Sequence, residues 1–343
     1  MKAERLQGAY APSPERRLAH ARMNPTKARL CALAIALAIG WLMASHVRAQ
    51  TNRPIIPEIV DVTHATKNSA AFFHSFFTSK SRHDVDAAMS HFSKSTLTYV
   101  DATLGWAFHT HGALRDVWAE YMPKWPVAGL SYPTRILGDD RSALVAFTDT
   151  PELFGGEIRT LAAIDIEDGK IVRWVDYWDG RHFGAELAVK LRTPSDKFPM
   201  DFKGTTVRGN ASPKIRAAAD KLHAALAKND AKAAAALFSS DAVYEDMTLR
   251  TQILGRPAIE RYLGRALAKL PAGTGSSMLH VVGGDMGGGF EWQTAPAYRT
   301  TVRRGITAIA LDAEGKVSRL TTVWDGAMLP LEEVNALVVL SID

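Results

Sequence analysis

The apolar and polar positions of this chain predict the same order of elements twice, with helices first and strands afterwards. The first set comprises helices over 68–77, 85–92 and 112–121, a short strand over 97–101, and later strands over 142–149, 157–166 and 171–178. The second set comprises helices over 212–228, 231–238 and 257–268, a short strand over 242–246, and later strands over 298–311 and 317–324. Turn residues at 167–169 and 313–315 predict a tight hairpin between the last two strands of each set.

Identical residues recur in the two sets at a nearly constant spacing. A shift of 145 positions aligns, without a gap, Tyr99 with Tyr244, Asp101 with Asp246, Thr103 with Thr248, Leu104 with Leu249, Ala113 with Ala258 and Pro126 with Pro271. A shift of 146 positions aligns Trp178-Asp179-Gly180 with Trp324-Asp325-Gly326. Matches that keep their order over such a long period predict a duplicated domain and exclude a solenoid of short repeats.

Helices followed by an antiparallel meander predict an α+β fold with a bent sheet. We expect two tandem cone-shaped domains, each with three N-terminal helices packed on a strongly curved mixed or antiparallel sheet. The concavity between sheet and helices is where a small ligand would bind. The predicted organisation is a leader over 1–49, a first domain over 60–184, a linker over 185–211, a second domain over 212–330 and a C-terminal tail over 331–343.

The leader has the parts of a cleavable export signal. Lys27 and Arg29 precede an apolar run over 30–44, and Val47 and Ala49 supply the small residues before a cleavage site. The run is shorter than the roughly 20 apolar residues that a spanning helix usually needs. We therefore expect an exported protein, periplasmic or secreted, that is not membrane-bound after signal cleavage; an uncleaved anchor is the alternative.

Charge and cysteine usage narrow the classes of partner and chemistry. The sequence pI is about 9.2, but the leader alone holds eight Lys and Arg residues against two acidic ones. The other residues carry 33 basic and 34 acidic side chains, which gives no electrostatic basis for binding nucleic acid. Cys31 lies in the leader, so the mature chain has no disulfide, no thiolate nucleophile and no Cys-ligated zinc.

One segment of the second set resembles a known family. Residues 238–246, which read FSSDAVYED, and 255–259, which read GRPAI, resemble the nuclear transport factor 2-like superfamily, above all its ketosteroid-isomerase and SnoaL-type polyketide-cyclase branches. The resemblance covers both sets, over roughly 65–183 and 213–328, and implies a SnoaL-like, tandem arrangement with one small-molecule pocket in each repeat. Because this superfamily includes isomerases, cyclases, lyases, hydrolases and inert binding domains, the resemblance specifies the fold better than the function.

The resemblance places a general-base aspartate at Asp246 and, by repeat symmetry, at Asp101. The isomerase has two hydrogen-bond donors. The position of one donor holds Leu222 in the second set, and the position of the other holds Leu161 in the first set and Thr307 in the second. An oxyanion hole is therefore missing from both sets, which argues against steroid isomerisation.

Asp101 and Asp246 have two interpretations. A carboxylate near apolar walls has a raised pKa and can exchange protons with a substrate. Alternatively, each aspartate begins a turn. The first set also offers His109 and His111, which would point the same way on an extended segment. The two histidines would form a base–orienter pair with Asp101, ligate a metal ion, or simply lie in a loop. Because no third metal ligand is evident, we predict no metal, and we also predict no cofactor.

Candidate substrate-binding residues come mainly from the last strand of each set. Trp174, Asp176 and Trp178 share one face of a strand, and Trp324 corresponds to Trp178. The tryptophans are pocket walls or ordinary core, and Asp176 is a pocket acid or an edge-strand polar residue. The remaining candidates are Tyr99, Trp106, Tyr244 and Thr307, although Trp106 and its aromatic neighbours also fit core or interdomain packing.

Two glycine-containing motifs are interpreted as structural. Asp179 and Asp325 precede glycines and are predicted to form turns. The glycine-rich stretch 283–289 lies between two strands, so it predicts a hairpin and not a phosphate-binding loop, which would open a helix.

Three functions remain open from the sequence. The first is acid–base catalysis of an isomerase, cyclase, lyase or hydrolase type on an apolar small molecule, which we favour. The second is non-catalytic binding of such a ligand, and the third is an interaction module with collapsed pockets. We also expect the repeats to pair as a pseudo-dimer within one chain or the chain to form a homo-oligomer.

Overall fold

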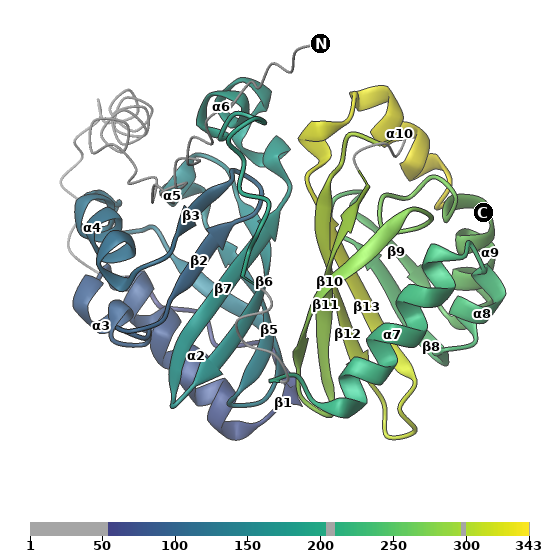
Figure 1. Ribbon diagram of the computed structural model, residues 1–343, viewed down its shortest axis with the longest axis horizontal. Helices are drawn as coiled ribbons and strands as arrows, with labels where there is room; N and C mark the ends of the chain where they lie inside the picture. The colour runs from purple at the N-terminus through teal and green to yellow at the C-terminus, as the bar shows by residue number, and fades with distance from the viewer. Residues whose placement is uncertain (1–53, 204–209, 296–299, 343) are drawn as a thin grey trace, which may run out of the picture. The chain divides into compact units, whose positions relative to one another are not determined.

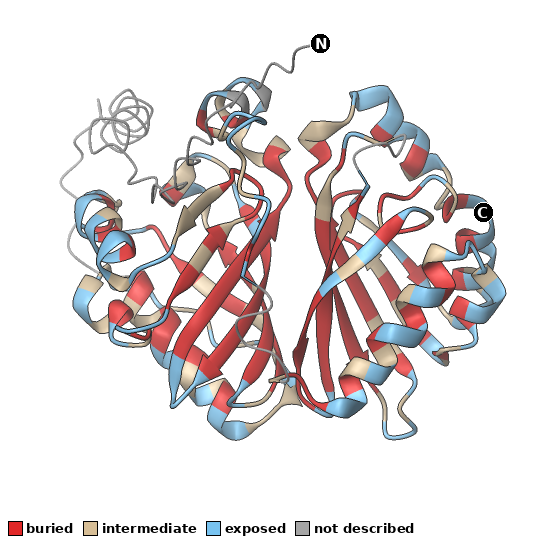
Figure 2. Cartoon of the chain, viewed as in Figure 1, coloured by how far each residue is buried: buried red, intermediate tan, exposed pale blue. Residues whose placement is uncertain are grey.

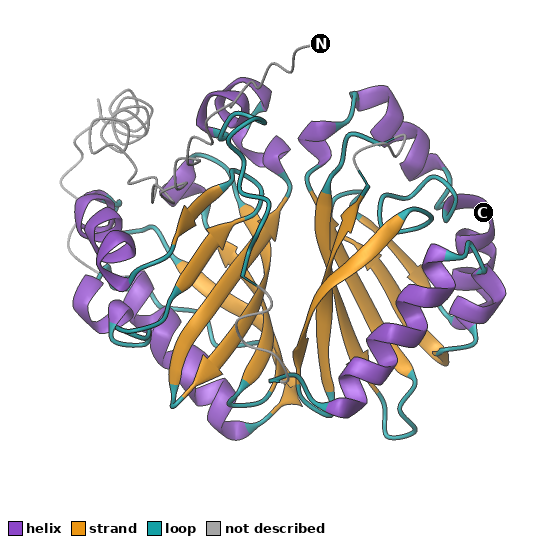
Figure 3. Cartoon of the chain, viewed as in Figure 1, coloured by secondary structure: helices purple, strands orange, loops and turns teal. Residues whose placement is uncertain are grey.

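The computed structural model describes residues 54–203, 210–295 and 300–342. The predicted leader lies outside these residues, so the signal peptide stays an expectation. The predicted fold class is confirmed: the chain is a mixed α+β protein with two separate sheets, and helices cover one face of each sheet (Figures 1 and 3). No helix within the described ranges is long and apolar enough to cross a membrane.

The first half contains a seven-stranded sheet in the order β1-β4-β5-β6-β7-β2-β3. Its strands are β1 (Asp61–Ala65), β2 (Thr98–Asp101), β3 (Trp106–Phe108), β4 (Ser131–Gly138), β5 (Ser142–Asp149), β6 (Ile158–Glu167) and β7 (Lys170–Trp178). Its helices are α2 (Lys67–Ser81), α3 (Val85–Met89), α4 (His111–Tyr121), η1 (Met122–Lys124), α5 (Pro151–Phe154), η2 (Gly180–Phe183) and α6 (Ala185–Leu191). β2 pairs in parallel with β7, so Asp101 lies beside Asp176.

The second half contains a six-stranded sheet in the corresponding order β10-β11-β12-β13-β8-β9. Its strands are β8 (Phe238–Asp246), β9 (Thr251–Leu254), β10 (Ser276–Gly283), β11 (Gly287–Thr294), β12 (Arg304–Leu311) and β13 (Val317–Trp324). Its helices are α7 (Pro213–Ala227), α8 (Ala231–Ala235), α9 (Arg256–Ala266), η3 (Gly326–Met328) and α10 (Leu331–Val339). The glycine-rich stretch 283–289 forms the predicted hairpin, between β10 and β11.

Side-chain caps explain where several helices begin. The hydroxyl of Thr66 accepts a hydrogen bond from the backbone N–H of Ser69 at the start of α2. Asp84 and Thr110 cap α3 and α4 in the same way, and Ser212 caps α7. Each cap provides an acceptor for a backbone N–H that the first helical turn leaves without a partner.

Several boundaries differ from the sequence-based expectation. Phe238 begins strand β8 instead of ending a helix. The expected linker 185–211 opens with helix α6, and the expected tail 331–343 contains helix α10, whose Val334 and Leu337 join the core of the second half. Strand β12 begins at Arg304, while the start predicted at 298 lies outside the described residues.

The sheet faces that the helices leave uncovered pack against each other. One hydrophobic cluster combines Leu144, Leu161 and Val175 of the first half with Ile306 and Ala308 of the second. The strands on both sides of this contact are largely buried (Figure 2). The two sheets therefore share a continuous apolar core.

Buried charged residues also cross between the sheets. Arg173 of β7 forms an ion pair with Glu291 of β11 at 2.7 Å, and the hydroxyl of Tyr177 donates to Glu291 at 2.8 Å. On the same face, His280 of β10 contacts the carboxylate of Asp165 of β6 at 2.7 Å. These contacts fix the register of one sheet against the other as well as satisfying buried charge.

The two Trp-Asp-Gly motifs contact each other reciprocally. The N–H of Gly180 donates to Asp325 Oδ1 at 2.9 Å, and the N–H of Gly326 donates to Asp179 Oδ1 at 3.2 Å. Each aspartate also caps its own short helix, as the turn-forming interpretation predicted. Such residue-for-residue exchange is the pattern of a two-fold symmetric contact.

Gly180→Ala is expected to lower the free energy of unfolding by about 1–3 kcal/mol, because the new Cβ would lie 2.7 Å from Asp325 Oδ1. Gly112→Ala is the matched control: no atom lies within 4 Å of its Cβ position, and alanine favours the helix by up to about 1 kcal/mol. Urea denaturation measures both. A Gly180→Ala variant as stable as the wild type would show that the motif contact is not tight.

Candidate functional site

Each half carries the same hydrogen-bonded turn after its short strand. In the first half, Asp101 Oδ1 accepts from the backbone N–H groups of Thr103 and Leu104 at 2.9 and 2.7 Å. Its Oδ2 accepts from the indole N–H of Trp178 at 3.1 Å. The carboxylate therefore positions both the turn and the end of β7.

The second half repeats this arrangement. Asp246 Oδ1 accepts from the N–H of Leu249 at 2.9 Å, and its Oδ2 accepts from the indole N–H of Trp324 at 3.2 Å. Thr248 exchanges hydrogen bonds with the backbone of Trp324. Asp101 and Asp246 thus begin turns, and Trp178 and Trp324 hold them. Because both halves contain this hydrogen-bond network, the network by itself does not indicate a catalytic site in either half.

The first half differs by a second carboxyl beside the turn. Asp176 Oδ2 accepts from the hydroxyl of Tyr99 at 3.2 Å and from the indole N–H of Trp174 at 3.1 Å. Asp176 Oδ1 has no hydrogen-bond partner among the described residues. Since Asp101 and Asp176 are cross-strand neighbours, two carboxyl groups share one face of the sheet.

Burial changes the protonation of these groups. Burial raises the pKa of Asp101 to about 6, although hydrogen bonds from Leu104, Trp178 and Thr103 lower it. Burial, together with the nearby charge of Asp101, raises the pKa of Asp176 well above its usual range. Burial thus favours the protonated form of both carboxyl groups, and the charge of Asp101 adds to this effect at Asp176.

Aromatic rings surround the carboxyl pair. Tyr99 stacks on Trp174 with ring centroids 6.0 Å apart and an interplanar angle of 13°. The ring centroids of Phe76 and Trp174 are 5.2 Å apart, and those of Phe92 and Trp118 are 5.5 Å apart. These rings belong to the buried hydrophobic core of the first half.

Tyr99 and Asp101 are enclosed by protein but keep an intermediate solvent exposure. The neighbouring strand β3 is also half-exposed at Trp106, Ala107 and Phe108. The β2–β3 hairpin is therefore the partly exposed side of this region, while Asp176 and its Oδ1 are buried.

Two further charged residues of the first half were missed by the sequence reasoning. Lys80 of α2 pairs with Asp149 of β5 at 3.3 Å, with both side chains at most one-tenth exposed. The ammonium group also lies 5.0 Å from the ring centroid of Phe147. Lys80 lies beyond the predicted helix over 68–77, and it joins the buried side of Phe76 and Phe77 because α2 continues to Ser81.

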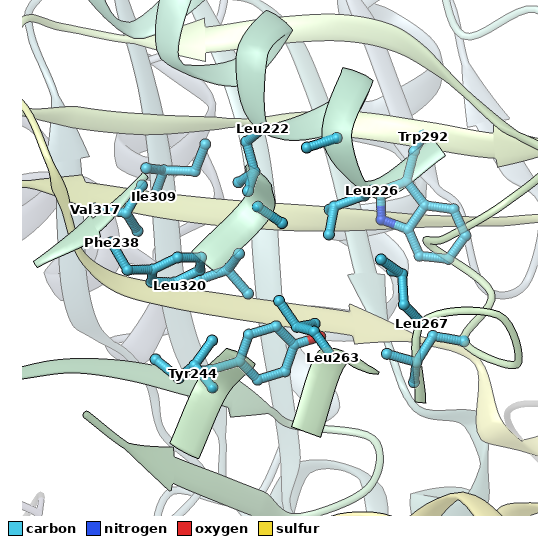
Figure 4. Close-up of a cluster of buried hydrophobic side chains, with 14 of the residues drawn as sticks. Leu222, Leu226, Phe238, Tyr244, Leu263, Leu267, Trp292, Ile309, Val317 and Leu320 are labelled. Atoms are coloured by element: carbon cyan, nitrogen blue, oxygen red, sulfur yellow. The ribbon is translucent and has the colours of Figure 1, made fainter. Parts of the chain in front are cut away.

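The interior of the second half is closed and apolar. Leu320 and Thr322 stand where the first half has Trp174 and Asp176. Asp246 is only 1% exposed, and Tyr244 packs on Tyr262 at 5.3 Å. Figure 4 shows leucine, isoleucine, valine and aromatic side chains filling this core. Thr307 only contacts the hydroxyl of Thr322, at 3.2 Å.

His109 and His111 do not form the expected base–orienter pair with Asp101. His111 begins helix α4 and contacts the carbonyl of Met89 at 3.2 Å, while exposed His109 lies near the hydroxyl of Thr98 at 3.4 Å. The expectation assumed one extended segment, but the helix cap at Thr110 separates the two rings. Across the described ranges, no group of three residues is arranged to hold a metal ion.

Trp106 is half-buried, and its indole N–H donates to the carbonyl of Leu191 at 3.0 Å. It therefore ties the β2–β3 hairpin to the end of α6. This contact fits the packing interpretation of Trp106 and places the ring at the rim of the exposed side of the hairpin.

Comparison with known proteins finds similarity to solved structures only. No protein-family profile and no curated protein sequence matches the chain. A solved structure of a putative ketosteroid isomerase from Kribbella flavida DSM 17836 is 18% identical over 33% of this chain and 78% of its own, with a TM-score of 0.29.

Two further solved structures have the same kind of match. A steroid delta-isomerase from Pseudomonas aeruginosa is 16% identical over 38% of this chain and 90% of its own, with a TM-score of 0.30. A SnoaL-like protein of unknown function from Burkholderia thailandensis E264 is 11% identical over 33% and 95%, with a TM-score of 0.28. The solved structures similar to this chain are thus NTF2-like, SnoaL-like and ketosteroid-isomerase-like proteins, each over about a third of its length.

Proposed function

We propose that the first half binds an apolar small molecule carrying a carbonyl group and transfers a proton on it, in the manner of a cofactor-independent isomerase or lyase. The observation that carries this proposal is the carboxyl of Asp176, which is buried and has one oxygen without a hydrogen-bond partner among the described residues; burial also raises its pKa. Buried polar groups are nearly always hydrogen-bonded, so a ligand oxygen is a suitable partner.

A neutral carboxylic acid can donate its proton in a hydrogen bond to a carbonyl oxygen. In an enclosed aromatic site this donor would stabilise negative charge that develops on the oxygen when a neighbouring C–H is deprotonated. Asp176 would take the role of the donor that is absent from position 161.

Asp101 is the candidate base. Its Oδ1 already accepts two hydrogen bonds, but Oδ2 accepts only one, from Trp178. An ionised carboxylate oxygen has two lone pairs, so Oδ2 retains one to accept a proton. Two adjacent carboxyls whose pKa values are driven apart provide one acid and one base near neutral pH.

The second half has the turn without the second carboxyl, so we assign it a supporting role. The matching turn networks and strand orders support the proposal that the halves are duplicated domains that pair within one chain. Export through the predicted signal peptide remains part of the proposal, resting on the sequence of the leader.

Solvent deuterium exchange tests the proposed function. Acetonaphthone, a flat aryl methyl ketone, is incubated with the protein in deuterated buffer, and exchange at its methyl group is followed by NMR. The proposal predicts catalysed exchange, and predicts weaker binding of ethylnaphthalene, which has no carbonyl. Binding of the ketone without exchange would leave the first half a ligand-binding domain only, and absence of both would contradict the proposal.

The pH dependence of the exchange rate has a defined sign. Asp101 is active as the ionised base, and its pKa is about 6. The rate should therefore rise about tenfold per pH unit below pH 6 and level off above it. A rate that falls between pH 5 and 7 would contradict the assignment of Asp101 as the base.

A further inference from the structure

Two grooves flank the packed sheet faces, and the described residues of the chain fill one of them. We define the linker groove as the space beside Val100, Ala102 and Gly105 that residues 198–202 occupy. We define the open groove as a cavity of about 930 Å³ between strands β4 to β6 of the first half and strands β8, β9 and β13 of the second. The two grooves lie at corresponding places in the two halves.

The linker groove is held by specific contacts. The guanidinium of Arg304 lies 4.2 Å from the ring centroid of Phe198 and donates to the carbonyl of Pro199 at 3.1 Å. Arg173 donates to the carbonyl of Phe202 at 2.9 Å. A Cβ on Gly105 would lie 2.6 Å from the ring of Phe198, so a glycine allows the close approach.

Strand register shows that the grooves are equivalent. Arg159 pairs with Thr148 in the first sheet, and Arg304 pairs with Gln293 in the second. The shift of 145 positions aligns Arg159 with Arg304 and Thr148 with Gln293. Arg159, which lines the open groove, thus corresponds to Arg304, which binds the linker.

The two grooves differ in polarity on the wall that faces the arginine. The shift of 145 places Glu245 and Met247 of the open groove where the linker groove has Val100 and Ala102. A groove with polar walls does not need an apolar segment to cover it. Its volume lies within the roughly 300–1,000 Å³ that is usual for small-molecule sites.

Positive charge exceeds negative charge along the open groove. Its arginines are Arg135, Arg159, Arg181 and Arg250. The first three form ion pairs, with Asp61, Glu157 and Asp179 respectively. Three acidic residues also line the groove, namely Glu157, Glu245 and Asp246, and Glu245 is paired with Arg319 at 2.7 Å.

Arg250 makes no ion pair within the described part of the chain, and its guanidinium lies 3.5 Å from the ring of His182. Its backbone has a φ of 56°, in the left-handed region that favours glycine. The corresponding turn residue of the first half, Gly105, has a φ of 76°.

We propose that the open groove is a second ligand site, which binds a small organic carboxylate through the guanidinium groups of Arg159 and Arg250. Arginine presents its donors in a planar fork that matches a carboxylate. Arg135 and Arg181 add positive potential, and Ala146 and Met247 offer apolar surface to the carbon skeleton. This site is separate from the carboxyl pair of the first half and takes a ligand of opposite character.

Calorimetric titration with benzoate, and with benzamide as its neutral analogue, tests the proposal. The wild type should bind benzoate saturably at millimolar concentration or below, and benzamide at least about tenfold more weakly. Arg159→Gln and Arg250→Gln should each weaken benzoate binding by about tenfold or more, because each removes a charge-assisted hydrogen bond.

Arg115→Gln is the matched control, since it removes an exposed arginine that pairs with Asp86 away from the groove. It should leave benzoate binding unchanged. Absence of saturable benzoate binding, equal affinity for benzamide, or equal affinity in the Arg159 and Arg250 variants would overturn the proposal. None of these results would bear on Asp176, which lies in the other site.

Discussion

Asp176→Thr is expected to reduce the rate of ketone deuterium exchange by a factor of about 10²–10³, the usual effect of losing one donor to a developing oxyanion. Threonine stands at the corresponding position, Thr322, in the second half, and it suits a buried strand there. The substitution therefore replaces the carboxyl group by a side chain that the second half accommodates at the corresponding position. Asp176→Asn keeps an N–H donor at the same place, and its rate should lie between those of the wild type and Asp176→Thr.

Asp246→Asn is the control for this prediction. It disturbs a turn with the same pattern of hydrogen bonds, but in the half that has no second carboxyl. Its exchange rate per folded molecule should equal that of the wild type. Equal rates for Asp176→Thr and the wild type would remove Asp176 from the mechanism, and a loss confined to Asp246→Asn would move the site to the second half.

Glu291→Gln is expected to lower the free energy of unfolding by about 3–5 kcal/mol, because it leaves the buried Arg173 without its close anionic partner. Both side chains are at most 2% exposed, so water cannot solvate the remaining charge. The other carboxylate near Arg173, that of Asp165, is 3.9 Å away. The new amide would also present an N–H group to a guanidinium that has no lone pair to accept it.

Asp86→Asn provides the comparison, since its pair with Arg115 has the same 2.7 Å distance but lies in solvent. An exposed pair contributes about 1 kcal/mol or less. Urea denaturation of both variants measures the difference. Equal losses would show that the buried pair between the sheets contributes no more than a surface pair.

The sequence predicted most elements because its local signals agree with the fold. Strands β5 and β13 have the predicted bounds, and α2, α4 and α7 lie within a few residues of theirs. Strands β1, β3, β4 and β9 were not predicted; β1 is a single short parallel strand at the edge of the first sheet, paired with β4. Helix α10 was taken for a tail because its apolar face is recognisable only against the core that it covers.

The candidate site was predicted only in part because its contacts join distant residues. The repeat identified Asp101, but its bond to the Trp178 indole depends on the parallel pairing of β2 with β7. The Lys80–Asp149 pair joins residues 69 positions apart, a separation for which spacing gives no signal. The two histidines were misplaced because a two-residue spacing indicates a shared direction only where no helix begins between them.

The distinction between Asp101 and Asp176 also needed three dimensions. From the sequence, the repeated aspartate was the stronger candidate and the unrepeated one was ambiguous. The structure shows the same turn hydrogen bonds at Asp101 and Asp246, whereas Asp176 has an oxygen without a partner among the described residues. The turn contacts shared by the two halves are structural, and the proposed chemistry rests on the residue in which the halves differ.

The central claim is that Asp176 holds its proton at neutral pH. An infrared difference spectrum between the wild type and Asp176→Thr at pH 7 measures this directly, because protonated and ionised carboxyl groups absorb in separate regions. The account predicts a carbonyl band of a protonated acid in the wild type that is missing from the variant. Loss of carboxylate bands instead would show that Asp176 is ionised and cannot donate a hydrogen bond to a ligand carbonyl.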